Sequence, residues 1–203
     1  MRCLMCGRPM YTTTINDLFS RQDVLCAQCR AEWKRLNRTL RFEGKKLHVL
    51  YEYNPAFASC LLQYKECMDE ALKPVFLYPD RTALKLRYIG RTILLLPSEP
   101  RKLQERGFSH LAGMFEGLGL PVLEPFYKDE ERSQKGHSAK EREAMIKHIR
   151  LKTGITLPKH VVLADDVITT GSTMKGALSV LPERTDVVLF SVAMALRQHQ
   201  GIS

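Results

Sequence analysis

The feature that most constrains the fold of this 203-residue chain is an apolar run that ends in two adjacent acids. The run Val161–Ala164 is continuous, as is typical of a strand buried on both faces of a parallel sheet. Asp165 and Asp166 follow it. We expect them at the carboxyl end of the strand, where ligands bind in open α/β sheets. The segment 174–181 then predicts a helix.

Between the acids and this helix lies a turn rich in hydroxyl groups, made of Thr169, Thr170, Gly171, Ser172 and Thr173. Hydroxyls, a flexible glycine and the free N–H groups of a helix start together form an anion site, most naturally for phosphate. For Ser172 and Thr173 the alternative is a helix-capping role. Two adjacent carboxylates can also accept hydrogen bonds from a vicinal diol, so the whole segment predicts a ribose-phosphate site.

Further apolar segments predict strands at 92–97, 121–126 and 187–192, with helical patterns between them. Strands that alternate with helices indicate an α/β fold with a mostly parallel sheet. Other reaction classes lack their motifs. The sequence has no G-x-x-x-x-G-K-[ST] loop for a nucleotide hydrolase, no G-x-G-x-x-G after a strand and no G-x-S-x-G elbow.

Four of the six cysteines form two C-x2-C pairs, Cys3 with Cys6 and Cys26 with Cys29. This spacing predicts a structural zinc ribbon in which four thiolates fill a tetrahedral site. Gly7 fits a tight turn after the second sulfur. Two disulfides are the alternative, which a cytosolic chain disfavours. We therefore expect a zinc-ribbon domain over residues 1–37 and a second domain over residues 38–203.

The formal net charge of +9 favours a polyanionic partner, either nucleic acid or a phosphorylated small molecule. An evenly basic, solvated surface is the alternative. Trp33, Tyr51 and Tyr53 lie in the basic N-terminal third and either stack bases or fill the core. No apolar stretch is long enough to span a membrane, and the N-terminus lacks the apolar region of a signal peptide, which predicts a cytoplasmic protein without membrane insertion.

Residues 161–173 resemble the phosphoribosyl pyrophosphate (PRPP) signature of type I phosphoribosyltransferases in the apolar run, the acid pair and the TTGST turn. Most of the chain resembles the ComF/ComFC competence proteins, which join an N-terminal zinc ribbon to a phosphoribosyltransferase domain. The matching elements are Tyr64-Lys65 (Y-K), Arg101 with Arg106-Gly107-Phe108 (R-x(4)-RGF), and Arg132, Gln134, Ser138 and Arg142 (R-x-Q-x(3)-S-x(3)-R, a hood region). Ser109-His110 stand where that family usually continues with Asn-Gln.

For the site, the resemblance implies a ribose 5-phosphate or PRPP-type ligand, which Mg²⁺ would accompany in the case of PRPP. It places this ligand at Asp165, Asp166 and the turn 169–173. The basic loop that approaches pyrophosphate would contain Arg101, Lys102, Arg106 and Gly107.

For the function, the resemblance implies a competence protein for DNA uptake in natural transformation. Its expected partners are single-stranded DNA and a ComFA-like helicase/ATPase, met in the cytoplasm or at the inner face of the membrane. Whether the chain catalyses a phosphoribosyl transfer stays open. The alternatives are a phosphoribosyltransferase of nucleotide salvage and a non-catalytic scaffold for the ComFA ATPase.

Overall fold

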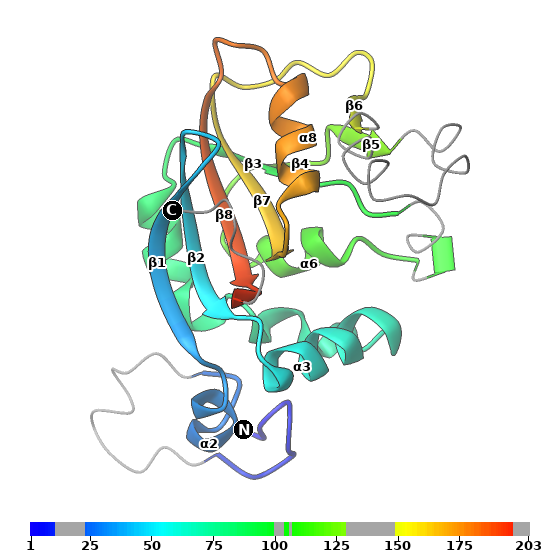
Figure 1. Ribbon diagram of the computed structural model, residues 1–203. Helices are drawn as coiled ribbons and strands as arrows, with labels where there is room; N and C mark the ends of the chain where they lie inside the picture. The colour runs from blue at the N-terminus through cyan, green and yellow to red at the C-terminus, as the bar shows by residue number, and fades with distance from the viewer. Residues whose placement is uncertain (11–22, 100–103, 106, 129–148, 197–203) are drawn as a thin grey trace, which may run out of the picture.

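The computed structural model describes residues 1–10, 23–99, 104–105, 107–128 and 149–196 (Figure 1). Its strands are β1 (Arg35–Phe42), β2 (Lys45–Glu52), β3 (Thr92–Leu95), β4 (Val122–Leu123), β5 (Phe126–Lys128), β6 (Ile149–Leu151), β7 (His160–Ile168) and β8 (Asp186–Met194). Its helices are α2 (Ala27–Ala31), α3 (Pro55–Glu66), α4 (Arg81–Arg87), α6 (His110–Glu116) and α8 (Ser172–Val180), with the 3-10 helices η1 (Glu70–Val75) and η2 (Tyr78–Asp80).

Within the described residues, six strands form a central sheet in the order β1-β2-β8-β7-β3-β4. β1 and β2 pair antiparallel, whereas every other neighbouring pair in this sheet is parallel. β5 and β6 form a separate antiparallel pair. The predicted fold class, α/β with a mostly parallel sheet, is therefore confirmed, and the four cysteines cluster near the N-terminus as a zinc ribbon requires.

Two layers cover the sheet, and the side chains of β7 alternate between them. Val162 and Ala164 belong to the core under α3, η1, α4 and α6, while Val161 and Leu163 belong to the core under α8 and the β5–β6 pair. All four residues are fully buried. This two-sided burial explains why the run reads as continuously apolar in the sequence.

The N-terminal segment packs against the same core as the sheet. Trp33, which follows α2, is 4% exposed, and its ring centroid lies 4.7 Å from that of Phe57 on α3 and 5.3 Å from that of Tyr51 on β2. The core interpretation of Trp33 and Tyr51 is thus confirmed, and neither ring is available to stack a base. Tyr53, the third aromatic considered, is 37% exposed.

The segment 121–126, predicted as one strand, is divided between β4 and β5. Pro125 separates them, and it has no N–H with which to continue a ladder. Among the described helices, none is long and apolar enough to cross a membrane.

The buried His48 on β2 gives a pH-dependent contribution to stability. It is 4% exposed, its Nδ1 lies 3.2 Å from the Tyr88 hydroxyl, and its Nε2 lies 3.0 Å from Asn37 Oδ1. Burial, assisted by the charge of Arg87, lowers the pKa of His48 to about 4. The folded state therefore holds this ring neutral in a pH range where the unfolded chain, with an ordinary pKa near 6.5, takes up a proton.

We expect the His48 contribution to be present in full above pH 6.5 and to be lost progressively down to about pH 4. Between pH 7 and pH 5 the free energy of unfolding should fall by about 2 kcal/mol more in the wild type than in His48→Gln, which cannot titrate. Urea denaturation at the two pH values measures this difference. Equal losses in the two proteins would show that His48 is not the group responsible.

Candidate functional site

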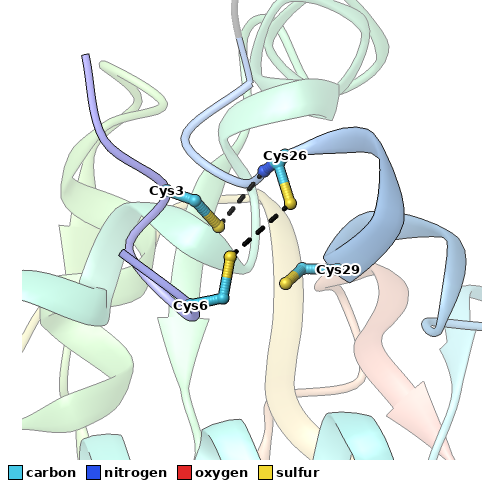
Figure 2. A group of neighbouring side chains, drawn as sticks. All are labelled: Cys3, Cys6, Cys26 and Cys29. Carbon is cyan, nitrogen blue, oxygen red and sulfur yellow. Dashed lines mark hydrogen bonds between the residues drawn. The ribbon is translucent and has the colours of Figure 1, made fainter. Parts of the chain in front are cut away.

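The two C-x2-C pairs converge on one cluster near the N-terminus (Figure 2). The Sγ atoms of Cys3, Cys6, Cys26 and Cys29 all lie within 4.8 Å of one another. The two knuckles are joined by the backbone, because Leu4 N donates to the carbonyl of Val24 at 3.1 Å. The first knuckle turns back at Gly7, as expected, because this residue has φ of +69°.

The spacing of the sulfurs fits a tetrahedral metal ion. A Zn–S bond of about 2.3 Å sets the edge of an all-sulfur tetrahedron at about 3.8 Å, and Cys6 Sγ lies 3.8 Å from Cys26 Sγ. Burial raises the pKa of the Cys3 thiol, but backbone N–H groups, chiefly that of Cys26, outweigh it and lower this pKa to about 6. Burial and the neighbouring thiols raise the pKa of Cys29. These four residues can therefore hold a metal ion, which would keep all four sulfurs as thiolates.

A second site lies at the carboxyl edge of the sheet, where β7 extends beyond its neighbour β3. Leu95, the last residue of β3, pairs with Ala164, so the acids of β7 pass the end of that strand. A cavity of about 180 Å³ opens there. Asp165, Asp166 and Thr173 line it, together with Pro97 and Ser98 from the loop after β3.

The acids lie inside β7 and not after it, which corrects the expected end of the strand. Asp165 and Val167 still pair with β8, opposite Ser191 and Ala193. The Ser191 hydroxyl also accepts a hydrogen bond of 3.0 Å from the N–H of Ile168. The strand continues because β8 remains beside it, while the loss of β3 on the other side leaves room for the cavity.

Asp166 is the most heavily bonded group of this site. Its Oδ2 contacts Nζ of Lys65 on α3 and accepts a hydrogen bond of 3.0 Å from Nε2 of His110 on α6. Its Oδ1 accepts from the N–H of Val167 at 2.7 Å. Burial alone would raise the pKa of Asp166, but Lys65 and His110 outweigh it and hold this pKa well below its usual range. Asp166 is thus an ionised, buried carboxylate that joins three elements.

Asp165 differs from its neighbour in both contacts and charge. Its Oδ1 accepts from the N–H of Asp166 at 2.9 Å, and within the described residues no cation forms a salt bridge with it. Burial and the adjacent charge of Asp166 raise the pKa of Asp165 well above its ordinary value. The carboxyl group of Asp165 therefore keeps capacity to bond a ligand in the cavity.

The turn after β7 presents its hydroxyls at the surface. Thr169 and Thr170 are exposed, and the Thr170 hydroxyl donates to Ser172 Oγ at 3.2 Å. The N-cap of α8 is Gly171, with φ of +74°, so the capping role considered for Ser172 and Thr173 is wrong. A Cβ at Gly171 would lie 2.4 Å from the ring of Phe42 on β1, and the position therefore requires glycine both for its backbone angle and for space.

The basic loop is described only in part. Arg101, Lys102 and Arg106 lie outside the described residues, as do the hood residues Arg132, Gln134, Ser138 and Arg142. Gly107 is described and is exposed. The described residues accordingly bring together the acid pair, the hydroxyl turn and the start of the loop after β3.

Two residues of the site, Lys65 and His110, were not among the predicted ligand-binding residues. The sequence carried a partial signal for each: Lys65 belongs to the Y-K element, and His110 stands at a departure from the family pattern. Tyr64 explains why they meet, because its hydroxyl donates to the carbonyl of His110 at 2.9 Å and so fixes α3 against the start of α6. The contacts with Asp166 span more than fifty residues and leave no local sequence pattern.

No protein-family model matches the sequence. Competence protein ComFC of Streptococcus pneumoniae (strain ATCC BAA-255 / R6) is 28% identical to it in an alignment 219 positions long, which covers 95% of this chain and 99% of that protein. The resemblance to the ComFC family is confirmed. The similarity covers nearly the whole length of both chains.

The Asp166 cluster predicts an unequal response to two lysine substitutions. Lys65→Met leaves a buried carboxylate without its cation, and the free energy of unfolding should fall by about 3 kcal/mol. Lys73→Met, which removes the Nζ–Oε2 contact of 2.8 Å with exposed Glu116, should have little effect. Urea denaturation of both variants makes the comparison. Adding Asp166→Asn to Lys65→Met should restore part of the loss, and no restoration would argue against the ion pair as its cause.

The cysteine cluster predicts one equivalent of bound metal per chain. Elemental analysis of the purified protein should show it in the wild type and in Cys67→Ser, whose thiol is exposed and outside the cluster. Cys29→Ser should lose most of the metal and lower the melting temperature, because the second knuckle leads directly into buried Trp33. A metal content far below equimolar in the wild type would overturn the assignment.

Proposed function

We propose that this chain is a competence protein that binds a ribose 5-phosphate or PRPP-type ligand and single-stranded DNA during DNA uptake. The observation that carries the first half is the cavity at the carboxyl edge of β3 and β7, which holds Asp165 and Asp166 beside the hydroxyl turn. The name of the S. pneumoniae relative, competence protein ComFC, supports the cellular role.

The ligand would use the two ends of the site differently. Asp165, with bonding capacity left, would accept hydrogen bonds from the ribose diol, while Asp166 keeps the strand end in place. The 5-phosphate would bind in the turn 169–173, where hydroxyls and the N–H groups at the start of α8 favour an anion. Both interactions lie within reach of one sugar because the acids and the turn are consecutive in the chain.

With PRPP, the remaining need is for positive charge near the pyrophosphate. Arg101, Lys102 and Arg106 are the proposed source within the chain, with Gly107 in the same loop. When Mg²⁺ is bound with PRPP, it would neutralise charge that develops on the leaving pyrophosphate. No general base is assigned, so catalysis is not part of the proposal.

Zinc is the proposed metal of the cysteine cluster, since four thiolates leave no open position for a substrate and suit a structural ion. We keep the division into a zinc-ribbon domain, residues 1–37, and a phosphoribosyltransferase-like domain, residues 38–203. Single-stranded DNA fits the net charge of +9, and a ComFA-like helicase/ATPase is the proposed protein partner. A salvage transferase and a non-catalytic scaffold for that ATPase are the competing functions.

Calorimetry with PRPP and Mg²⁺ separates these functions. The wild type should release heat on binding, and Asp165→Asn should weaken binding about tenfold, because an amide is a poorer acceptor for the diol than a carboxylate. Asp186→Asn is the matched control, since this exposed carboxylate lies at the amino end of β8.

Absence of heat from the wild type would reject the sugar-phosphate site and leave the scaffold. Release of pyrophosphate with an added nucleobase would favour the salvage enzyme. A gel shift with single-stranded oligonucleotides at two salt concentrations tests the DNA half, and an affinity that does not fall with salt would contradict it.

A further inference from the structure

A second cavity, of about 390 Å³, lies on the helical face of the sheet and is lined by residues of η1, η2, α4 and α6. Its volume is in the range of small-ligand pockets. α6 takes part in both cavities: His110 and Leu111 in its first turn line the one at the acid pair, and Met114 in its second turn lines this one. We call this second cavity the α6 slot.

The interior of the α6 slot is apolar with one aromatic wall. Leu77, Met114 and Leu118 line it, each 2% exposed. Tyr78 lines it as well and is half-buried. The guanidinium carbon of Arg81 lies 4.5 Å from the centroid of the Tyr78 ring, which sets a cation at the edge of the apolar surface.

Two glycines line the slot near the end of α6. Gly113 lies in α6, and Gly117 is the C-cap of that helix. At Gly113 an added Cβ would meet the hydroxyl of Tyr64 at 2.6 Å, so side chains already fill the space beside that residue. At Gly117 nothing lies within 4 Å of an added Cβ, and this open space beside apolar and aromatic side chains suits a flat ring.

The rim of the slot is positive. Lys73 is paired with Glu116 at 2.8 Å. Arg81 and Lys85 lie one turn apart on α4, and in the described part of the chain neither forms a salt bridge. Lys85 does not line the slot but lies close to it, because its Nζ would lie 3.3 Å from a Cβ placed at Gly119, the residue after the lining residue Leu118. The slot thus combines an apolar interior with two nearby cations that form no salt bridge within the described residues and can pair with an anionic ligand.

We propose that the α6 slot binds a nucleotide, with the base inserted between Gly117 and Tyr78 and the phosphate at Arg81 and Lys85. A planar aromatic ring joined to an anion is the chemistry that matches both halves of the slot. The nucleotide can belong to a single strand or be free. Binding of a nucleotide within a single strand rests on the proposed function, because it specifies where single-stranded DNA binds. Binding of a free nucleotide does not rest on the proposed function.

The test fills the slot without straining the backbone. Gly117 has φ of −67° and open space at its Cβ, so Gly117→Phe should fold and block the slot, while Gly117→Ala is the matched control. Arg81→Gln removes the rim charge, with Arg184→Gln, an exposed residue between α8 and β8, as its control. Circular dichroism and the PRPP titration confirm that each variant is folded.

Fluorescence anisotropy with a labelled single-stranded oligonucleotide, and calorimetry with dAMP, distinguish the two sources. For a strand, Gly117→Phe should weaken oligonucleotide binding about tenfold or more, as expected for the loss of one stacked base. Arg81→Gln should reduce the salt dependence by about one phosphate contact. For a free nucleotide, only dAMP binding should be lost in these variants.

The proposal is overturned if the wild type binds neither probe, or if both probes bind Gly117→Phe as tightly as Gly117→Ala. In the second case oligonucleotide binding by the wild type would still support the DNA half of the proposed function. If all four variants release the same heat on binding PRPP, their sugar-phosphate site is intact. Either result then concerns the α6 slot alone.

Discussion

The buried contact of Asp166 with Lys65 and His110 is the interaction on which the acid-pair site depends. A carboxylate with a side chain 8% exposed would be costly without partners, and here α3 supplies a cation while α6 supplies a hydrogen-bond donor. Tyr64 ties these two helices together through the carbonyl of His110. The position of the carboxyl end of β7 and the positions of both helices are therefore mutually dependent, and the cavity beside Asp166 exists only when all three elements are in place.

Much of this arrangement could be predicted from sequence, and the rest could not for physical reasons. The apolar run ending in Asp165 and Asp166 identified a buried parallel strand, because two-sided burial leaves a continuous pattern. The end of that strand was misplaced, since its length depends on β8 remaining alongside after β3 has ended. The capping role considered as an alternative for Ser172 and Thr173 was wrong, because the N-cap of α8 is Gly171 and no side chain caps this helix.

The N-terminal cysteine cluster is connected to the rest of the molecule through aromatic packing. Arg30 forms a two-point contact with Asp23, donates to the carbonyl of Val75 at 2.9 Å and lies 4.7 Å from the centre of the Trp33 ring. Trp33 in turn packs on Phe57, and η1 contributes Phe76 at its C-terminal end. A metal at the cysteines would thus order the segment that delivers Trp33 into the core. The spacing of the cysteines predicts the ligands but not this connection, which arises from residues far apart in the chain.

The two adjacent acids differ in contacts and in charge because their surroundings differ. The oxygens of Asp166 are already occupied: Oδ2 by Lys65 and His110, Oδ1 by the N–H of Val167. Asp165 has one bond from a neighbouring N–H and a raised pKa, so it can accept a hydrogen bond when ionised and donate one when protonated. Two equally ionised carboxylates at this depth would repel each other, and Lys65, with the hydrogen bond from His110, resolves the conflict by fixing the charge on Asp166. The pair is therefore a structural anion beside a carboxyl group that keeps bonding capacity toward the cavity, and this division follows from which helix packs on which face of β7.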